Sequence, residues 1–158
     1  MPTTECGFEN RPDVLVHYGP TLYIEIGFDP NFRPNSEGKP DLSANQFPAL
    51  VDTGASVSCI DSGLAMELDL PIVDRGDIAG AHGSGAVDFH LAQIYVPSLH
   101  WTIFSQFAGV HLIAGGQPHY ALIGRDFLQN FTMTYEGPTG VVTLSNNPDS
   151  DRIDEPKA

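Results

Sequence analysis

The stretch that decides the fold is FPALVDTGASVSCI, residues 47–60. Residues 47–51 form a short apolar run bounded by turn-forming residues, which favours a buried strand. That strand delivers Asp52 to its end, where Thr53 and Gly54 follow. A carboxylate held at the edge of a core is open to the pKa shifts that desolvation and a second carboxylate produce. The stretch is therefore the first candidate for chemistry, although the bare tripeptide is also typical of a plain turn.

A second informative stretch is YALIGRDFLQNF, residues 120–131. Its first part, residues 121–123, is a short apolar run that predicts a buried strand, and residues 125–130 predict a helix of one or two turns. Between the two stretches, residues 78–96 predict a strand, a glycine-rich turn and a second strand. The apolar alternation slips by one residue near 92–93, which predicts a bulge or a bend there.

The rest of the chain predicts further short elements. Residues 21–28 alternate between apolar and polar positions, as a half-buried strand does. Residues 29–46 are rich in proline and polar residues and predict a long surface loop. Asp61 and Ser62 are candidate caps for a short helix. The remaining expected elements are a strand at 57–60, one long bent strand or a strand pair at 101–112, and a hairpin at 131–144.

Composition and charge narrow the classes of fold and partner. The chain has 158 residues, which is the size of one domain. Its formal net charge of −13 repels phosphate backbones and anionic lipid, so we expect neither nucleic acid nor a membrane surface as a partner. No apolar run approaches the roughly 18 residues of a spanning helix. The first ten residues show no secretory signal, so the expected location is the cytoplasm.

Glycine and proline content favours an all-β domain. The chain holds 16 glycines and 13 prolines, which suits many short strands joined by turns. Cys6 and Cys59 are too far apart in sequence for a common metal-ligand pattern, and the six histidines show no ligand spacing. We therefore expect no metal and no cofactor. The expected organisation is an N-terminal arm (1–20), one domain (21–144) and an acidic disordered tail (145–158).

Residues 47–60 and 120–131, in this order and with the glycine-rich hairpin between them, resemble the retropepsins. These are the single-domain aspartic proteases of retroviruses, with bacterial and eukaryotic relatives. The resemblance covers about residues 21–144 and implies a closed β-barrel equivalent to half of an acid protease, with one or two short helices and a flap hairpin. It also implies that the strand at 122–124 braces the loop that carries Asp52.

The resemblance further implies roles for individual residues. The catalytic residues would be Asp52, Thr53 and Gly54. The hairpin at 79–86 would be the flap, with glycines that supply positive φ angles at its tip. The flap and the floor of the site would bind substrate, and the crossing segment would support the catalytic loop. The substrate-binding residues would be Ala55, Ser56, Ala81, His82, Gly83, Ser84 and Gly85, and the supporting residues Ile123, Gly124, Arg125 and Asp126.

Two positions depart from the pattern of the viral enzymes. Ser56 stands where those enzymes commonly have an acid that pairs with the arginine of the second segment. Arg125 is therefore expected to lack that partner, and Asp126 or Asp61 is the candidate to replace it. The flap sequence around His82 also differs from a plain aliphatic and glycine tip, which leaves the substrate preference open.

The implied mechanism needs two catalytic aspartates, and the chain supplies one of them, Asp52. The one other match to Asp-Thr/Ser-Gly, which begins at Asp61, lies nine residues beyond Asp52 and opens the expected helix. A second lobe would need roughly 150 more residues. We therefore expect a homodimer that pairs two Asp52 side chains and hydrolyses a protein or peptide substrate. The alternative is a catalytically silent module of the same fold that binds a peptide or merely dimerises.

Overall fold

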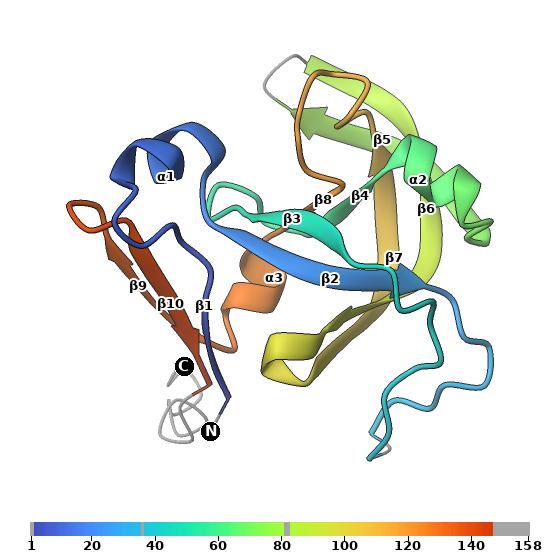
Figure 1. Cartoon of the computed structure of the whole chain (residues 1–158). Helices are drawn as coiled ribbons and strands as arrows, with labels where there is room; N and C mark the ends of the chain where they lie inside the picture. The colour runs from blue at the N-terminus through green and yellow to red at the C-terminus, as the bar shows by residue number, and fades with distance from the viewer. Residues whose placement is uncertain (1, 36, 81–82, 147–158) are drawn as a thin grey trace, which may run out of the picture.

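Figure 1 shows a computed structural model, which describes residues 2–35, 37–80 and 83–146. Its helices and strands are β1 (Thr3–Glu5), α1 (Pro12–Tyr18), β2 (Thr21–Gly27), β3 (Phe47–Val51), β4 (Cys59–Asp61), α2 (Ser62–Glu67), β5 (Ile72–Gly80), β6 (Gly83–Val96), a 3-10 helix (Pro97–Leu99), β7 (Trp101–Val110), β8 (Ala121–Ile123), α3 (Arg125–Leu128), β9 (Thr132–Glu136) and β10 (Val141–Ser145).

Six strands close into a barrel. They follow one another in the order β2-β3-β8-β4-β7-β6, and β6 pairs back with β2. Closure satisfies the backbone groups that an open sheet leaves at its edges. β5 extends the sheet beyond β6 and forms the hairpin at the top of Figure 1. The expectation of an all-β fold with a closed barrel and a few short helices is confirmed.

The core lies inside this barrel. β2 alternates as its sequence predicts, with Leu22, Ile24 and Ile26 at most 2% exposed. β3 runs parallel to β8, and β4 runs parallel to β7. Both faces of β3 and β8 are at least partly buried, which explains why the sequences of these two strands are continuous apolar runs rather than alternating ones. Their pairing also places the end of β3 beside the end of β8.

A second, smaller sheet joins the two ends of the described chain. β10 lies between β1 and β9 and pairs antiparallel with both, so the predicted hairpin at 131–144 is confirmed. The turn between β9 and β10 needs glycine at 140, where φ is +77° and a Cβ would lie 2.2 Å from the Phe8 carbonyl oxygen. The N-terminal segment is therefore packed closely against this hairpin.

The helix α1 is a feature that the sequence analysis did not predict. It starts with Pro12 and has Asp13 in its first turn, which are ordinary N-terminal features. Leu15 is the only buried residue of this helix, so its sequence has no apolar periodicity that would predict a helix. Residues 1–20 thus carry more regular structure than expected. Of the tail expected at 145–158, Ser145 ends β10, and residues 147–158 lie outside the described part of the chain.

Of the bulge or bend expected near 92–93, the bulge is wrong. β6 pairs with β7 from Phe89 to Val96 without a shift in register, and the interruption lies instead between Ile72 and Asp74 in β5. The apolar alternation fails because β6 is buried on both faces around Gln93, which is 0% exposed. The Gln93 amide accepts a hydrogen bond from the Asp29 N–H (2.7 Å) and donates one to the Asp29 carbonyl (3.1 Å).

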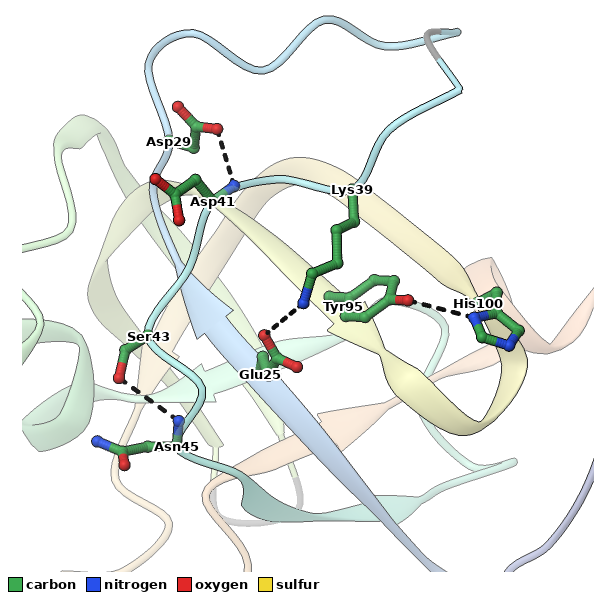
Figure 2. A network of polar contacts seen from close by, with 8 residues as sticks. All are labelled: Glu25, Asp29, Lys39, Asp41, Ser43, Asn45, Tyr95 and His100. Atoms are coloured by element: carbon green, nitrogen blue, oxygen red, sulfur yellow. Dashed lines mark hydrogen bonds and ion pairs between the residues drawn. The ribbon is translucent and has the colours of Figure 1, made fainter.

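That contact fastens the long loop at 29–46 to the barrel, and Figure 2 shows more of its anchors. Lys39 extends over the ring of Tyr95, with its Nζ 4.8 Å from the ring centre and 3.6 Å from the Glu25 carboxylate, a side chain only 5% exposed. Within the loop, the Asp41 N–H donates to the Asp29 carboxylate (2.9 Å). The loop and the barrel enclose a hollow of about 630 Å³ beside Tyr95 and Trp101.

No helix in the described part of the chain is long and apolar enough to cross a membrane.

Candidate active site

Asp52 lies where β3 leaves the barrel, directly beside the end of β8. Its N–H donates to the Ile123 carbonyl oxygen (2.9 Å), which continues the pairing of Val51 with Ile123. The side chain is partly exposed, and its Oδ1 accepts a hydrogen bond from the Gly54 N–H (2.9 Å). No other donor among the described residues binds this carboxylate. The backbone is therefore fixed while one carboxylate oxygen is left available.

The segment after β8 crosses the loop that carries Asp52, as the sequence analysis expected. The Arg125 N–H donates to the Ala55 carbonyl (2.8 Å), and the Asp126 N–H donates to the Ser56 carbonyl (3.2 Å). The crossing requires glycine at 124, because a Cβ there would lie 2.7 Å from the Ala55 carbonyl oxygen. The backbones of the two segments are thus in direct contact.

A buried side-chain network locks this crossing. The Asp126 carboxylate accepts hydrogen bonds from the Ser58 N–H (3.0 Å) and the Ser58 hydroxyl (2.8 Å). The same hydroxyl oxygen accepts a bond from the Gly124 N–H (2.9 Å). Ser58 is 3% exposed, so these bonds form away from water. The sequence analysis did not single out Ser58; one serine in a short apolar strand gives no signal without its partner in the second segment.

The side chain of Arg125 binds main chain rather than a carboxylate. Its Nη1 donates to the Thr53 carbonyl oxygen, with a separation of 2.6 Å. The two carboxylates considered as substitute partners are engaged elsewhere: Asp126 binds Ser58, and Asp61 caps α2 by accepting the Leu64 N–H (3.0 Å). The expectation that one of them replaces the missing acid is therefore wrong. Arg125 instead holds the loop at residues 52–54 through the Thr53 backbone.

The charges at this site act on the neighbouring thiol. Cys59 is 5% exposed, and burial raises its pKa to about 11. The negative charges of Asp52 and Asp126 contribute in the same direction, while a hydrogen bond from the Leu122 backbone opposes them. The thiol therefore stays protonated at neutral pH and is a poor nucleophile.

The hairpin proposed as the flap is present, but its glycines lie in a strand. β5 and β6 pair up to Gly80 and Gly83, and the connecting residues Ala81 and His82 lie outside the described part of the chain. Gly83 and Gly85 belong to β6, and φ at Gly85 is not in the left-handed region. The expectation of positive φ at Gly85 is therefore wrong, because the hairpin turns earlier than its glycines suggest.

Other features bear on what the site can hold. Among the described residues, no group of three or more His, Cys, Asp or Glu is arranged to hold a metal ion. The described hollows of about 630, 260 and 210 Å³ contain none of residues 52–56 in their walls. In the single chain Thr53, Gly54 and Ser56 are exposed, and Asp52 and Ala55 are partly exposed.

Comparisons with known proteins agree with the residues at this site. The model of a family described as "gag-polyprotein putative aspartyl protease" matches residues 41–130, which include both the Asp52 loop and the segment that crosses it. No curated protein matches the chain.

Solved structures of three proteases are similar to the chain. The simian foamy virus (mac) protease in solution is 16% identical over 68% of this chain and 90% of that one, with a TM-score of 0.42. The EIAV protease in complex with the inhibitor HBY-793 is 18% identical over 70% and 85%, with a TM-score of 0.44. A retropepsin-like aspartic protease from Rickettsia conorii is 13% identical over 90% of both chains, with a TM-score of 0.48.

The family model spans more than half of the 158 residues, and its match holds the aspartate, its loop and the crossing segment together. This chain belongs to the gag-polyprotein aspartyl protease family.

Proposed function

We propose that the chain is an aspartic endopeptidase that hydrolyses peptide bonds as a homodimer. The observation that carries the proposal is the Asp52 carboxylate: its backbone is held by β8 and its side chain is partly exposed. In a family of aspartyl proteases, that is the arrangement needed to present a carboxylate to a substrate and a water molecule.

The proposed reaction uses two Asp52 side chains, one from each chain. Two carboxylates a few ångströms apart cannot both be ionised, so they share one proton. The ionised member removes a proton from a water molecule, and the protonated member polarises the scissile carbonyl. Water oxygen then bonds to the carbonyl carbon, and the carbon–nitrogen bond breaks as the leaving amine takes up a proton. The pair titrates as a unit.

In this proposal the second carboxylate comes from another copy of the chain. The one other Asp-Thr/Ser-Gly triplet of this sequence begins at Asp61, which is 5% exposed and accepts hydrogen bonds from three backbone N–H groups. A twofold axis beside Asp52 would bring two equal loops together. Thr53 is exposed next to Asp52, and we expect its hydroxyl to bond across that axis.

Substrate binding is proposed for the floor of the site and for the hairpin. Ala55 and Ser56 follow the catalytic tripeptide on the same open loop, and Ser56 is exposed. The β5–β6 hairpin, with Ala81, His82 and Gly83–Gly85 at or near its turn, is the proposed flap that closes on an extended peptide. The valine variant Gly85→Val should lower kcat/KM several-fold with little change in Tm, and unchanged kinetics would remove the flap assignment.

The test of the function is direct. The protein and its Asp52→Asn variant are incubated with a diverse peptide mixture between pH 4 and 8, and products are identified by mass spectrometry. Cleavage by the wild-type protein alone supports the proposal. No cleavage by either, at concentrations where the chain is dimeric, favours the silent binding module. Equal cleavage by both places the chemistry elsewhere.

A further inference from the structure

A hollow separate from the Asp52 loop lies between α1 and the outer face of β2 and β3. Its volume is about 260 Å³, close to the lower limit of small-ligand sites and enough for one large side chain. We call it the α1 pocket. It is lined by Phe8, Val14, Tyr18, Thr21, Tyr23, Pro48, Pro118 and His119.

The wall of the α1 pocket carries no charge. The chain as a whole has 20 acidic and 7 basic residues, yet none of the eight lining residues is Asp, Glu, Lys or Arg. The only lining residue that can carry a positive charge is His119. An uncharged wall in so acidic a protein excludes charged ligands, because burying an unpaired charge against it costs several kcal/mol.

His119 is held in its neutral form. The Thr21 hydroxyl donates its one hydrogen to the Gly19 carbonyl (3.1 Å), so its 2.9 Å contact with His119 Nε2 assigns the proton to that nitrogen. His119 is 3% exposed, and no described residue bonds its buried Nδ1. Protonation would create a second buried N–H there without an acceptor, and burial also lowers the pKa of the ring.

Aromatic and proline rings supply most of the contact surface. The rings of Phe8 and Tyr18 lie 6.3 Å apart between centroids, tilted by 43°. Tyr23 is 60% exposed and pairs with Pro48 across β2 and β3. Such a set of rings favours an aromatic partner, because aromatic pairs at these separations gain energy beyond the area they bury.

The α1 pocket lies along the strand that carries the catalytic aspartate. Pro48 and Leu50 alternate with the buried Ala49 and Val51, so they share the outward side of β3. Asp52 follows two residues beyond Leu50. At about 3.3 Å per residue, the four steps from Pro48 to Asp52 span about 13 Å, which an extended peptide covers with about four residues.

We propose that the α1 pocket is an accessory substrate site that binds one uncharged aromatic side chain of a polypeptide, about four residues from the bond that is cut. This inference rests on the proposed endopeptidase function. Five of the eight lining residues, Phe8, Val14, Tyr18, Thr21 and Tyr23, precede the segment 41–130 that matches the family model. The preference is therefore a property of this chain's own N-terminal segment.

The first test measures binding and does not require catalysis. The full chain carrying Asp52→Asn is titrated with N-acetylphenylalaninamide, N-acetylalaninamide and N-acetylglutamic acid amide while its NMR spectrum is recorded. The aromatic probe should bind at least about fivefold more tightly than the other two and should shift the resonances of Tyr23 and His119. Equal binding of the three probes, or shifts confined to other residues, would overturn the proposal.

Two substitutions on one helix provide a matched pair. Val14 lines the α1 pocket, whereas Val16 is 83% exposed and does not. Val14→Glu places a carboxylate in the uncharged wall and should abolish binding of the aromatic probe, while Val16→Glu adds the same charge outside and should leave the affinity unchanged. Tyr23→Thr is the second variant, in case Val14→Glu unfolds, and should weaken binding several-fold. An unchanged affinity in Tyr23→Thr contradicts the proposal.

The second test uses cleavage by the wild-type protein. In one cleaved peptide, a phenylalanine is moved through the positions flanking the scissile bond and compared with alanine. KM should fall at one position about four residues away, with kcat unchanged, and Tyr23→Thr should remove that gain. If no peptide is cut, the proposed function fails and the probe titration alone decides on the α1 pocket. If peptides are cut without this preference and the probes bind equally, the pocket proposal alone fails.

Discussion

The chain contains the triplet aspartate, hydroxyl residue, glycine twice, and the two copies differ in what surrounds the carboxylate. Asp52 is partly exposed and accepts one hydrogen bond, from the Gly54 N–H, among the described residues. Asp61 is 5% exposed, and its two oxygens accept bonds from the backbone N–H groups of Leu64, Leu112 and Ile113. The Asp52 carboxylate therefore keeps one oxygen with no donor among the described residues, whereas both oxygens of Asp61 accept hydrogen bonds from the backbone.

The difference shows that the tripeptide does not determine the role of its aspartate. At Asp52 the backbone is held from outside, by Ile123 and by the carbonyl bond from Arg125, so the side chain is not needed for stability. At Asp61 the side chain itself joins α2 to the end of β7, because it caps the helix and binds residues 112–113. Isosteric substitution at each position should separate the two roles.

The largest effect is expected on turnover. Asp52→Asn keeps the volume and an acceptor for the Gly54 N–H but cannot act as a base, so kcat/KM should fall by about 10³-fold or more with Tm almost unchanged. Asp61→Asn should keep kcat/KM within about twofold of the wild-type value, at a temperature where the variant is folded. Peptide cleavage and thermal unfolding are measured on both variants. A reversal of the two results would exchange the roles assigned to the two triplets.

The next effect concerns the pairing of chains. Mixing wild-type chains with about a ninefold excess of Asp52→Asn chains, followed by re-equilibration, should leave about one tenth of the activity per wild-type chain, because most wild-type chains then sit in inactive heterodimers. The same excess of Asp61→Asn chains carries intact Asp52 and should not inhibit. Activity that depends on neither mixing nor protein concentration, in a chain that sediments as a monomer, would contradict the dimer.

A smaller effect is expected on stability at the second triplet. In Asp61→Asn one oxygen becomes an NH₂ group, so at least one of the three buried N–H donors loses its acceptor and faces another donor. The expected cost is about 2 kcal/mol of the free energy of unfolding, or a fall in Tm of roughly 4–8 °C. Chemical denaturation measures this cost. A loss below about 0.5 kcal/mol would show that the Asp61 bonds do not stabilise the fold.

Local patterns in the sequence predicted strands and helices correctly where the residues of the element itself determine its structure. β3, β8, the capped helix α2 and the β9–β10 hairpin each carry their signals within a few residues. The predictions at Gln93 and Arg125 were wrong because contacts with residues far away in the sequence determine the structure there. The Asp29 backbone covers Gln93 from 64 residues away, and this burial mimics a bulge. The partner of Arg125, the Thr53 carbonyl, is main chain and has no sequence signal at all.

The smallest predicted effect tests what holds the Asp52 loop while leaving the carboxylate alone. Ser58 joins Gly124 and Asp126 through its hydroxyl, so Ser58→Ala leaves a buried N–H without an acceptor and a carboxylate without one of its donors. The expected loss is about 1–2 kcal/mol, or roughly 3–6 °C in Tm, with a several-fold fall in kcat as the loop loosens. Ser56 is exposed on the same loop, and Ser56→Ala should stay within about 0.5 kcal/mol of the wild type. Thermal unfolding of both variants and the kinetics of Ser58→Ala make the comparison. If the two serines cost the same stability, the crossing segment is held by its backbone bonds alone, and the availability of Asp52 does not depend on the buried network.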